Sequence, residues 1–442
     1  MLKRYSRKDM EFLWSEEKKF LLWFLVECTV LNVRHDRREF KHPVRPDMAK
    51  KVVIDPAEIN RLEKGWIENG VKKEGTGHEV IAFLMHVSPQ IPEELRPWLH
   101  NGLTSYCVVD TALALQMRAS IDIIIADVDK LMNAIKKRAY EFKDTPEIGR
   151  THGIHAEPIT FGVKLANWYA ELGRHRKRLA LAREEVSVGK LSGAVGMYTI
   201  SPEIEEAVCA KLGLQPIIAT QIISRDIAAL YMSTLANLAG SIGKIATNLR
   251  LLSQTEIREV MEPFGTAQKG SSAMPHKKNP VGNENISGLM RIPGTNYLVA
   301  LENLASCWHE RSLDNSGSER VILADSSILV DYVLARLTSI VENMRVFPDK
   351  MLRNLMATKG LVFSQDVMML FAKKSNFPRE DAHTIVRNVA LKCWEDDTDF
   401  FYALCAEEEV MAYVSRDELR SCFNLGTKLA HVDYIFNRAF GE

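Results

Sequence analysis

Apolar side chains recur at spacings of three and four residues along several long stretches of this chain, the pattern of amphipathic helices. The longest stretch, residues 103–145, contains neither glycine nor proline. Its apolar stripe consists of Leu113, Met117, Ile121, Ile124, Val128, Leu131 and Ile135. We predict one continuous helix here, on the order of 35–50 Å long.

Three further stripes of this kind follow. They consist of Phe161, Leu165, Trp168, Leu172 and Leu179; of Tyr231, Leu235, Leu238, Ile242, Ile245, Leu249 and Leu252; and of Leu329, Val333, Leu337, Ile340 and Met344. Alternating strand patterns are scarce, so we predict an all-α fold with a bundle of long helices. Stripes of this length usually face more than one neighbour, which favours self-association.

Glycines interrupt one stripe and mark the breaks between helical regions. Gly240 and Gly243 lie inside the stripe that begins at Tyr231, and each costs about 1 kcal/mol relative to alanine. Either close packing of another helix or a local kink would explain them. Breaks near Gly102 and residues 358–360 divide the chain into a predicted N-terminal helical domain (1–105), a central long-helix domain (106–358) and a C-terminal helical domain (359–442).

Charge and cysteine usage exclude several classes of protein. Lys+Arg and Asp+Glu number 57 each among 442 residues, so no global field favours nucleic acid or an acidic membrane. The seven cysteines are scattered without a CxxC pair, which indicates reduced thiols in the cytoplasm. The apolar run Phe20–Val26 is too short to span a bilayer, which takes roughly 20 residues, and we expect a buried helix there. The N-terminus lacks a signal-peptide core.

The most informative polar segment is residues 270–280, Gly-Ser-Ser-Ala-Met-Pro-His-Lys-Lys-Asn-Pro. Glycine and paired serines provide mobility and exposed backbone donors, and His276, Lys277 and Lys278 add positive charge. Such a loop can close over an anion and exclude water. A solvated connector between helices has the same composition, and composition alone does not separate the two.

A second polar segment, Arg150–Pro158, carries His152 and His155. Pro158 suits the first turn of the following helix, so we expect both histidines just before that helix. Histidine can protonate a leaving nitrogen near neutral pH. The alternatives are a metal-ligating pair, for which the sequence offers no standard third ligand, and ordinary capping residues.

Two weaker segments precede helices. Thr104 and Ser105 stand before the longest stripe, where they are either simple caps or part of a helix N-terminus that binds a carboxylate. His78 stands next to Glu79, and a lone histidine of this kind is more often structural.

Together these segments resemble the fumarase/aspartase superfamily over nearly the whole chain. Residues 270–280 match its specific signature, GSSxMPxKxNP. Within the superfamily the chain is most similar to the adenylosuccinate lyase family. The basis is Arg-Tyr-Ser at 4–6 with Trp14, the RTHGIHAEP form of residues 150–158, His276 in the loop, and Trp-His-Glu-Arg at 308–311.

This resemblance implies an all-α homotetramer whose core is a bundle of long helices from all four subunits. Each active site is then shared among three subunits, with no metal and no organic cofactor. The implied reaction is β-elimination of fumarate from a succinyl-purine nucleotide, giving AMP from adenylosuccinate and AICAR from SAICAR.

The resemblance also implies residue roles. Ser271 becomes the general base and His152 the general acid, with Glu284 orienting His152. The substrate-binding set is Arg4, Tyr5, His78, Glu79, His100, Thr104, Ser105, Gln221, Ser272, Lys277, Lys278, Asn279, Asn285, Arg311, Ser316 and Arg320. Of these, Arg4, Tyr5, Gln221, Arg311, Ser316 and Arg320 are expected to face the nucleotide.

Some positions depart from the family pattern. Gly77 replaces a basic or amide residue, Glu79 an aspartate, and Cys107 a common aspartate. Residues 312–317 are Ser-Leu-Asp-Asn-Ser-Gly, where many members have DISHSS. Three rivals remain: another lyase of the superfamily, a catalytically silent helical tetramer, and a metal hydrolase using the histidines.

Overall fold

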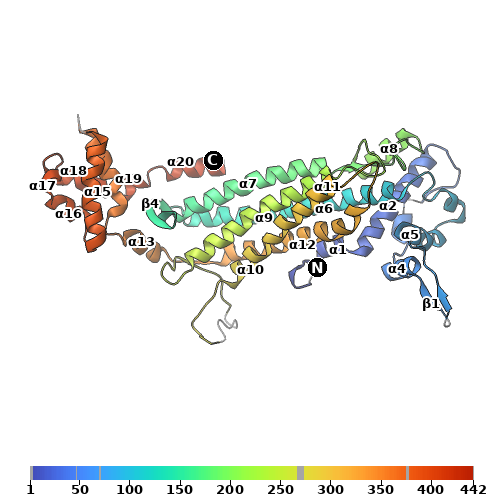
Figure 1. Cartoon of the computed structure of the whole chain (residues 1–442), viewed down its shortest axis with the longest axis horizontal. Helices are drawn as coiled ribbons and strands as arrows, with labels where there is room; N and C mark the ends of the chain where they lie inside the picture. The colour runs from blue at the N-terminus through green and yellow to red at the C-terminus, as the bar shows by residue number, and fades with distance from the viewer. Residues whose placement is uncertain (1–2, 46, 69–70, 266–272, 375–377, 442) are drawn as a thin grey trace. The chain divides into compact units, whose positions relative to one another are not determined.

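The computed structural model describes residues 3–45, 47–68, 71–265, 273–374 and 378–441 (Figure 1). Regular structure in these ranges is mostly helical, which confirms the all-α prediction. The strands are short and form four two-stranded sheets among the described residues.

Four long helices carry the apolar stripes. They are α6 (Ser105–Glu141), α7 (Phe161–Glu185), α9 (Asp226–Leu252) and α12 (Asp314–Asn343). All of the stripe residues are buried except Leu113, which is partly buried, so these helix predictions are confirmed. α9 continues through both of its glycines. A Cβ atom at Gly243 would lie 3.6 Å from Cβ of Met290, whereas Gly240 faces open space.

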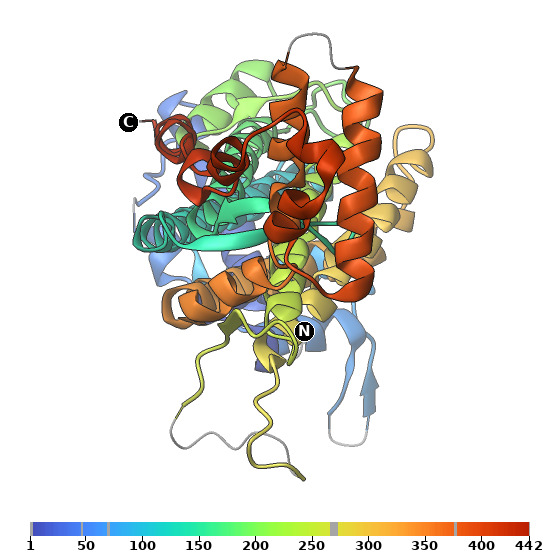
Figure 2. The ribbon, with the colours of Figure 1, turned by 90° about the vertical axis from the view of Figure 1, so that its left-hand side faces the viewer.

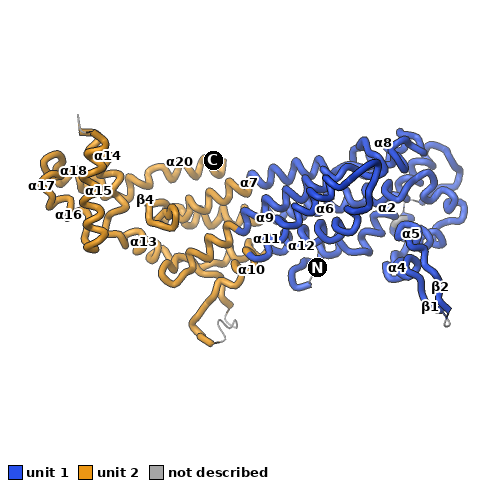
Figure 3. Tube along the Cα trace, viewed as in Figure 1, with its two compact units in different colours: residues 1–129, 174–243, 288–335 blue, residues 130–173, 244–287, 336–442 orange. Residues whose placement is uncertain are grey.

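The chain divides into two compact units (Figure 3). Unit 1 comprises residues 1–129, 174–243 and 288–335, and unit 2 comprises residues 130–173, 244–287 and 336–442. The boundaries fall inside the four long helices and inside α10 (Val281–Leu289), so each unit is built from separate stretches of chain. The three consecutive domains stay a prediction.

Unit 1 holds the N-terminal helices around an aromatic core. Its other elements are η1 (Lys3–Tyr5), α1 (Lys8–Leu13), α2 (Glu16–Asp36), α3 (Met48–Lys51), α4 (Pro56–Lys64), β1 (Trp66–Glu68), β2 (Val71–Lys73), α5 (Glu79–Val87), η2 (Ser88–Gln90), η3 (Glu93–Trp98), β5 (Val188–Gly189), α8 (Pro202–Leu212), β6 (Gln215–Pro216) and α11 (Arg291–Ala305). Phe20 and Trp23 of α2 pack against Phe83 of α5, which confirms the buried helix predicted at 20–26.

Unit 2 holds the C-terminal helices, which gather around one another in Figure 2. Its other elements are β3 (Pro146–Thr151), β4 (Ile154–Thr160), β7 (Val260–Met261), α10 (Val281–Leu289, ending in unit 1), β8 (Arg345–Val346), α13 (Pro348–Met356), η4 (Leu361–Phe363), α14 (Ser364–Lys373), α15 (Arg379–Asp396), α16 (Phe400–Ala406), α17 (Glu408–Met411), α18 (Arg416–Cys422), α19 (Leu425–Lys428) and α20 (Val432–Phe440). Phe371 and Phe400 are fully buried in the core of α14–α18.

No single helix in the described ranges has both the length and the apolar composition of a membrane span. The bent pair Pro348–Met356 and Leu361–Lys373 meets the criterion only when its two helices are taken together, and their axes differ by 75°.

Candidate active site

His152 lies at the tip of a β-hairpin in unit 2. Strands β3 and β4 pair antiparallel with Thr151 opposite Ile154, which leaves His152 and Gly153 as a two-residue turn. Their φ values are +55° and +81°, as a type I′ turn requires. The hairpin geometry therefore holds His152 in an exposed position with a backbone conformation that few residues adopt.

The hairpin corrects one local prediction. Pro158 does not open a helix; it lies in β4 opposite Ile148, and α7 begins only at Phe161. A two-stranded sheet consists of edge strands, which tolerate a proline that cannot donate a ladder hydrogen bond.

A metal-ligating pair was one alternative for His152 and His155. No group of three or more His, Cys, Asp or Glu side chains suited to a metal ion occurs within the described ranges.

Buried ion pairs anchor strand β3 of the hairpin. Arg150 of β3 donates two hydrogen bonds, of 2.9 and 2.7 Å, to the fully buried carboxylate of Glu259. Asn354 of α13 donates to the same carboxylate at 2.8 Å. Lys164 of α7 pairs with Glu147 of β3. These contacts fix the strand that leads to His152.

Burial changes the titration of two groups in this cluster. Burial raises the pKa of Glu147 to about 7, although Lys164 opposes the shift. Burial and the charge of Arg150 lower the pKa of His155, with Glu259 acting in the other direction. A neutral imidazole at His155 is therefore favoured.

The signature loop is described only in part. Ser271 and Ser272 lie outside the described residues. Lys277 is exposed, and its amide donates to the carbonyl of Met274 at 3.0 Å. Lys278 is also exposed, with its ammonium 5.1 Å from the ring centre of Phe264.

A cavity of about 1090 Å³ in unit 2 is lined by the loop and by cationic side chains. Its basic lining residues are Arg250, Arg258, His276, Lys277, Lys278 and Arg345. Asn279 and Glu284 also line it. The excess of positive charge suits a substrate with carboxylates.

Two predicted residues at the start of α10 differ in their surroundings. Glu284 is exposed and, among the described residues, makes no hydrogen bond with His152, so its orienting role stays a prediction. Asn285 has a buried side-chain oxygen without a hydrogen-bond partner in the described part of the chain. The free amides of this helix start are already used, because Glu262 accepts from Gly282 at 2.9 Å and from Asn283 at 2.5 Å.

In unit 1 the structure brings several predicted residues together. Oγ of Ser105, the first residue of α6, lies 3.5 Å from Nε2 of His78. Glu79 accepts hydrogen bonds from Lys19 at 2.6 Å and from Arg320 at 3.1 Å. Burial would raise the pKa of Glu79, but Lys19 and Arg320 outweigh it and the pKa is lowered. Glu79 therefore stays charged and orders two cations.

The remaining predicted residues near this group have simpler surroundings. Thr104 precedes α6, and its carbonyl accepts from the amide of Cys107 at 2.9 Å. His100 has a φ of +57°, and its Nδ1 lies 2.6 Å from the buried carboxylate of Glu27. Glu27 also accepts a hydrogen bond from the backbone amide of His100 at 3.0 Å, so one carboxylate holds both the ring and the backbone of this histidine.

A smaller cavity in unit 1 contains two of the predicted nucleotide contacts. Its volume is about 270 Å³, and its lining includes Lys19, Tyr106, Arg225, Ser316 and Arg320. Lys19, Arg225 and Arg320 bring three cations to this lining, and three carboxylates balance them, so the pocket is polar without an excess of positive charge. The carboxylates are those of Glu16, Asp110 and Glu319.

Gln221 and Arg311, also predicted to face the nucleotide, bind each other. Nη1 of Arg311 donates to Oε1 of Gln221 at 2.7 Å. The guanidinium carbon of Arg311 lies 4.1 Å from the ring centre of Tyr106, a cation–π distance. Because Tyr106 lines the smaller cavity, the pair lies beside that wall.

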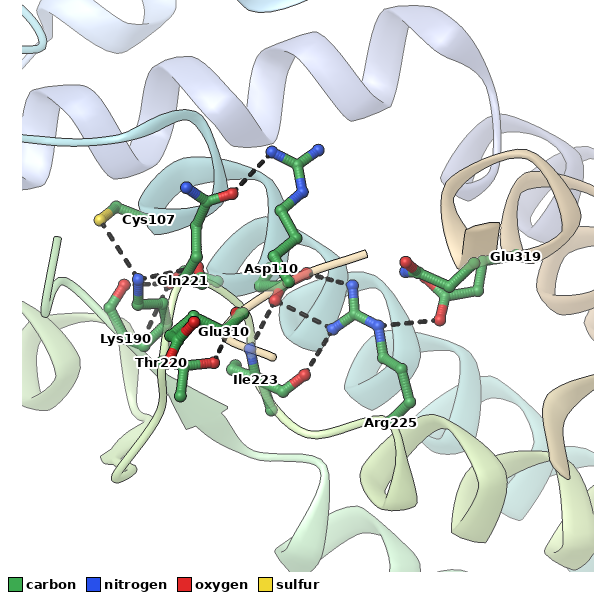
Figure 4. A network of polar contacts seen from close by, with 12 residues as sticks. Cys107, Asp110, Lys190, Thr220, Gln221, Ile223, Arg225, Glu310 and Glu319 are labelled. Atoms are coloured by element: carbon green, nitrogen blue, oxygen red, sulfur yellow. Dashed lines mark hydrogen bonds and ion pairs between the residues drawn. The ribbon is translucent and has the colours of Figure 1, made fainter. Parts of the chain in front are cut away.

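A buried polar network supports this wall (Figure 4). Asp110 of α6 accepts two hydrogen bonds of 3.0 Å from Arg225, and Arg225 pairs with Glu319 of α12 at 3.0 Å. Asp110 also accepts the amide of Ile223 at 2.7 Å. The three charged side chains are less than a tenth exposed, so their geometry is rigidly defined.

Arg4 and Tyr5 belong to η1, and the nearby Arg7 attaches this segment to α6 and α12. Nη1 of Arg7 donates to Oδ1 of Asp331 at 2.8 Å and also binds Asp127. The ring of Tyr5 packs edge-on against Tyr332, with 5.7 Å between centres. Arg4 itself is exposed.

Sequence reasoning missed the charged residues that support the site. Arg150 was recognised only as part of a motif, and Lys190, Arg225 and Glu259 were not singled out. Their partners are distant along the chain, as with Arg225 and Asp110, and no local spacing announces such a pair. An unpaired charge in an otherwise apolar or loop segment is the one available signal.

Comparison with known proteins identifies the family. A family model described as "Lyase" matches residues 48–294, and one described as "Adenylosuccinate lyase C-terminus" matches residues 360–439. The adenylosuccinate lyase of Aquifex aeolicus is 41% identical, covering 100% of this chain and 99% of that protein. The adenylosuccinate lyase of Bacillus subtilis is also 41% identical, covering 99% of both chains.

Solved structures share the fold. A fumarate lyase from Mesorhizobium sp. superimposes with a TM-score of 0.86 at 24% identity, covering 99% of this chain and 98% of that one. The 3-carboxy-cis,cis-muconate lactonizing enzyme of Pseudomonas putida gives 0.84 at 27% identity, covering 98% and 96%. The full-length relatives and both family models show that this chain belongs to the adenylosuccinate lyase family of the fumarase/aspartase superfamily.

Proposed function

We propose that this protein is a lyase that cleaves adenylosuccinate into fumarate and AMP by β-elimination. The observation that carries the proposal is the 41% identity with named adenylosuccinate lyases along the entire chain. The cationic cavity of unit 2 suits a substrate with two carboxylates and a phosphate. We extend the proposal to SAICAR, whose succinyl group and leaving nitrogen present the same chemistry.

The elimination removes a proton beside a carboxylate, and negative charge then spreads into that carboxylate. Preset positive donors lower the energy of this state. Lys277 and Lys278, with Asn279 beside them, line the cavity where such donors are needed. We assign the general base to Ser271, which becomes basic enough only where the loop excludes water and the lysines stabilise its alkoxide.

The leaving nitrogen needs a proton from the opposite side, and we assign this step to His152. Its exposed position at a hairpin tip leaves the imidazole free to meet a substrate. General-acid assistance of this kind contributes about 10²–10⁴-fold to the rate.

We further propose a homotetramer with shared active sites. Leu298 of α11 and Val321 of α12 are 60% and 56% exposed in the single chain. Cβ positions at Gly240 and Gly294 meet open space, so a neighbouring helix could approach closely there. The proposed location is the cytoplasm, since all seven cysteines are free.

Activity is tested by incubating the chelator-treated protein with adenylosuccinate and separating the products. We expect AMP and fumarate in equal amounts, without added metal. Activity lost on chelation and restored by zinc would contradict the mechanism, and turnover of argininosuccinate or malate alone would indicate another lyase of the superfamily.

Site sharing is tested by mixing two inactive proteins, His152→Ala and Ser271→Ala, after dissociation and allowing reassembly. If each site takes the two groups from different subunits, random assembly leaves roughly a quarter of sites intact. No recovery, with mixed oligomers confirmed by mass, would contradict a shared site.

A further inference from the structure

Lys190 places a charged ammonium group deep inside unit 1, where its side chain is fully buried. The ammonium has three hydrogens, and the structure provides three acceptors. Nζ donates to the carbonyl of Gly193 at 2.8 Å and to the carbonyl of Gln221 at 2.9 Å, and it lies 3.7 Å from Sγ of Cys107. Figure 4 shows the amine between Cys107 and Gln221. Every donor of this cation is therefore used within the protein.

This burial is costly, because no carboxylate neutralises the ammonium directly. None of the ion pairs among the described residues includes Lys190. Burial lowers the pKa of Lys190, against the opposing effects of Cys107, Asp110 and Glu205. A buried cation without a paired anion is a poor stabilising device. Its position is more easily explained by what it holds.

Lys190 holds two segments that lack regular structure. The carbonyl of Gly193 belongs to residues 190–201 and that of Gln221 to residues 217–225, and neither range is helix or strand. The two segments touch, because a Cβ at Gly196 would lie 2.4 Å from the carbonyl of Ala219. The ammonium acts as a cross-link where no ladder of backbone hydrogen bonds exists.

The held segment carries a predicted nucleotide contact. Gln221 is fixed through its carbonyl by Lys190 and through its amide by the carbonyl of Glu310 at 3.3 Å. Its side chain then accepts the 2.7 Å hydrogen bond from Arg311. A shift of the Gln221 backbone would move this acceptor and release Arg311 from the ring of Tyr106.

We propose that Lys190 is a positioning residue for nucleotide recognition. By holding the backbone carbonyls of Gly193 and Gln221, it fixes the position of the Gln221 side-chain oxygen, which orients Arg311 over Tyr106. Lys190 touches no substrate and takes no part in proton transfer. This inference rests on the proposed function, because it names what the unit 1 pocket recognises. Its consequence is an effect on nucleotide affinity that is much larger than the effect on turnover.

The test compares the wild type with Lys190→Met, which removes the charge and all three donors at similar length. We expect KM for adenylosuccinate and the dissociation constant for AMP, measured by calorimetry, to rise roughly ten- to a hundredfold, the effect of losing a charged hydrogen-bonding group. We expect kcat to change less than about threefold. A folded variant with wild-type KM and AMP affinity overturns the proposal. A wild type without turnover contradicts the proposed function instead.

A double-mutant cycle with Gln221→Ala shows whether Lys190 acts through Gln221. If it does, Lys190→Met adds little to the KM of Gln221→Ala, whereas fully additive effects overturn the proposal. If Lys190→Met does not fold, Lys190→Arg replaces it in the double-mutant cycle with Gln221→Ala. Its planar guanidinium keeps the charge but cannot direct three tetrahedral donors. We expect KM to rise about two- to fivefold with the same non-additivity, and an unchanged KM would overturn the proposal.

Cys107→Asp is the matched control, because it places a carboxylate beside the ammonium. With Lys190 present, the new ion pair should leave KM within about threefold of the wild type. Combined with Lys190→Met, the same carboxylate is buried without a counter-charge, and Tm should fall further than in either single variant. An equal fall in Tm from Cys107→Asp in both backgrounds would show that residues 107 and 190 do not interact in solution and would overturn the proposal.

Discussion

The buried wall of the unit 1 pocket and the hairpin tip of unit 2 follow opposite structural rules. Asp110, Arg225 and Glu319 are almost completely buried, and each charged group is held by a partner on another element. His152 is exposed at a turn, while the strands beside it are held through Arg150 of β3 and Glu157 of β4. One region pairs its charges within a single chain, and the other presents an exposed histidine to its surroundings.

This difference follows from what each region is proposed to do. Recognition of a nucleotide needs donors and acceptors that keep their positions before the ligand arrives, which buried and fully paired groups provide. Proton transfer needs a side chain that can approach the substrate, and a hairpin tip allows this while the strands beside it stay anchored. Substitutions in the two regions should therefore have different consequences.

The largest effect is expected at the proposed acid, His152 at the hairpin tip, and the proposed base, Ser271 of the signature loop. His152→Ala and Ser271→Ala should each reduce kcat by about 10²–10⁴-fold. Loss of the exposed His152 side chain should not lower Tm by more than a few degrees, because exposed residues contribute little to stability. Steady-state kinetics and a thermal scan at fixed protein concentration measure both quantities.

Ile154→Ala is the control for disturbance of the hairpin, since Ile154 adjoins the turn and is 65% exposed. We expect its kcat to remain within about threefold of the wild type. A His152→Ala protein with near-normal turnover would transfer the general-acid role to another group, and His155 is then the next candidate.

The sequence contains enough information to predict the long helices but not the hairpin. Burial of one helix face imposes a repeat of three and four residues, which is visible at Leu235, Leu238 and Ile242. The hairpin has a weaker signal. His152-Gly153 is a suitable type I′ turn, but the strands beside it contain Gly149 and Pro158, which are poor strand residues.

The site was predictable only where chemistry is concentrated in short segments. Residues 270–280 and 150–158 are such segments, and both lie within the stretch that the lyase family model matches, while the roles of their residues stay predictions. The pairs Asp110–Arg225 and Lys190–Gln221 join residues 115 and 31 positions apart, so nothing in the local pattern reveals them. The hydrogen bond between Glu79 and Arg320 is another example, because these residues are 241 positions apart in the sequence.

The next largest effect is expected at the buried wall. Asp110→Asn leaves Arg225 buried with only Glu319 as its counter-charge and weakens the acceptor for the amide of Ile223. Loss of one partner of a buried pair costs about 3–5 kcal/mol in free energy of unfolding. Denaturant titration at fixed protein concentration measures it. A loss below about 1 kcal/mol would show that this network is solvated in solution.

A smaller, pH-dependent effect is expected beneath the hairpin. Burial raises the pKa of Glu147 from 4.5 to about 7 against the opposing charge of Lys164. Between these values the folded protein binds more protons than the unfolded chain, so the contribution of Glu147 to stability falls as pH rises through this window. Glu147→Gln removes the titration. The stability of the wild type relative to this variant should fall by at most about 3 kcal/mol from pH ~4.5 to pH ~7. A constant difference across that range would contradict the shift.

The smallest effect is expected for an exposed ion pair of similar geometry. Arg176 donates to the two carboxylate oxygens of Asp129 at 2.6 and 3.2 Å, much as Arg225 does to Asp110. The difference is burial, because Arg176 and Asp129 are 48% and 39% exposed. Water solvates both charges when the pair is broken, so Asp129→Asn should cost no more than about 1 kcal/mol, and added salt should reduce even that. Denaturant titrations of Asp129→Asn and Asp110→Asn at low and high salt make the comparison. Equal losses would show that burial does not distinguish the two pairs, and the rigidity inferred for the wall of the pocket would then be wrong.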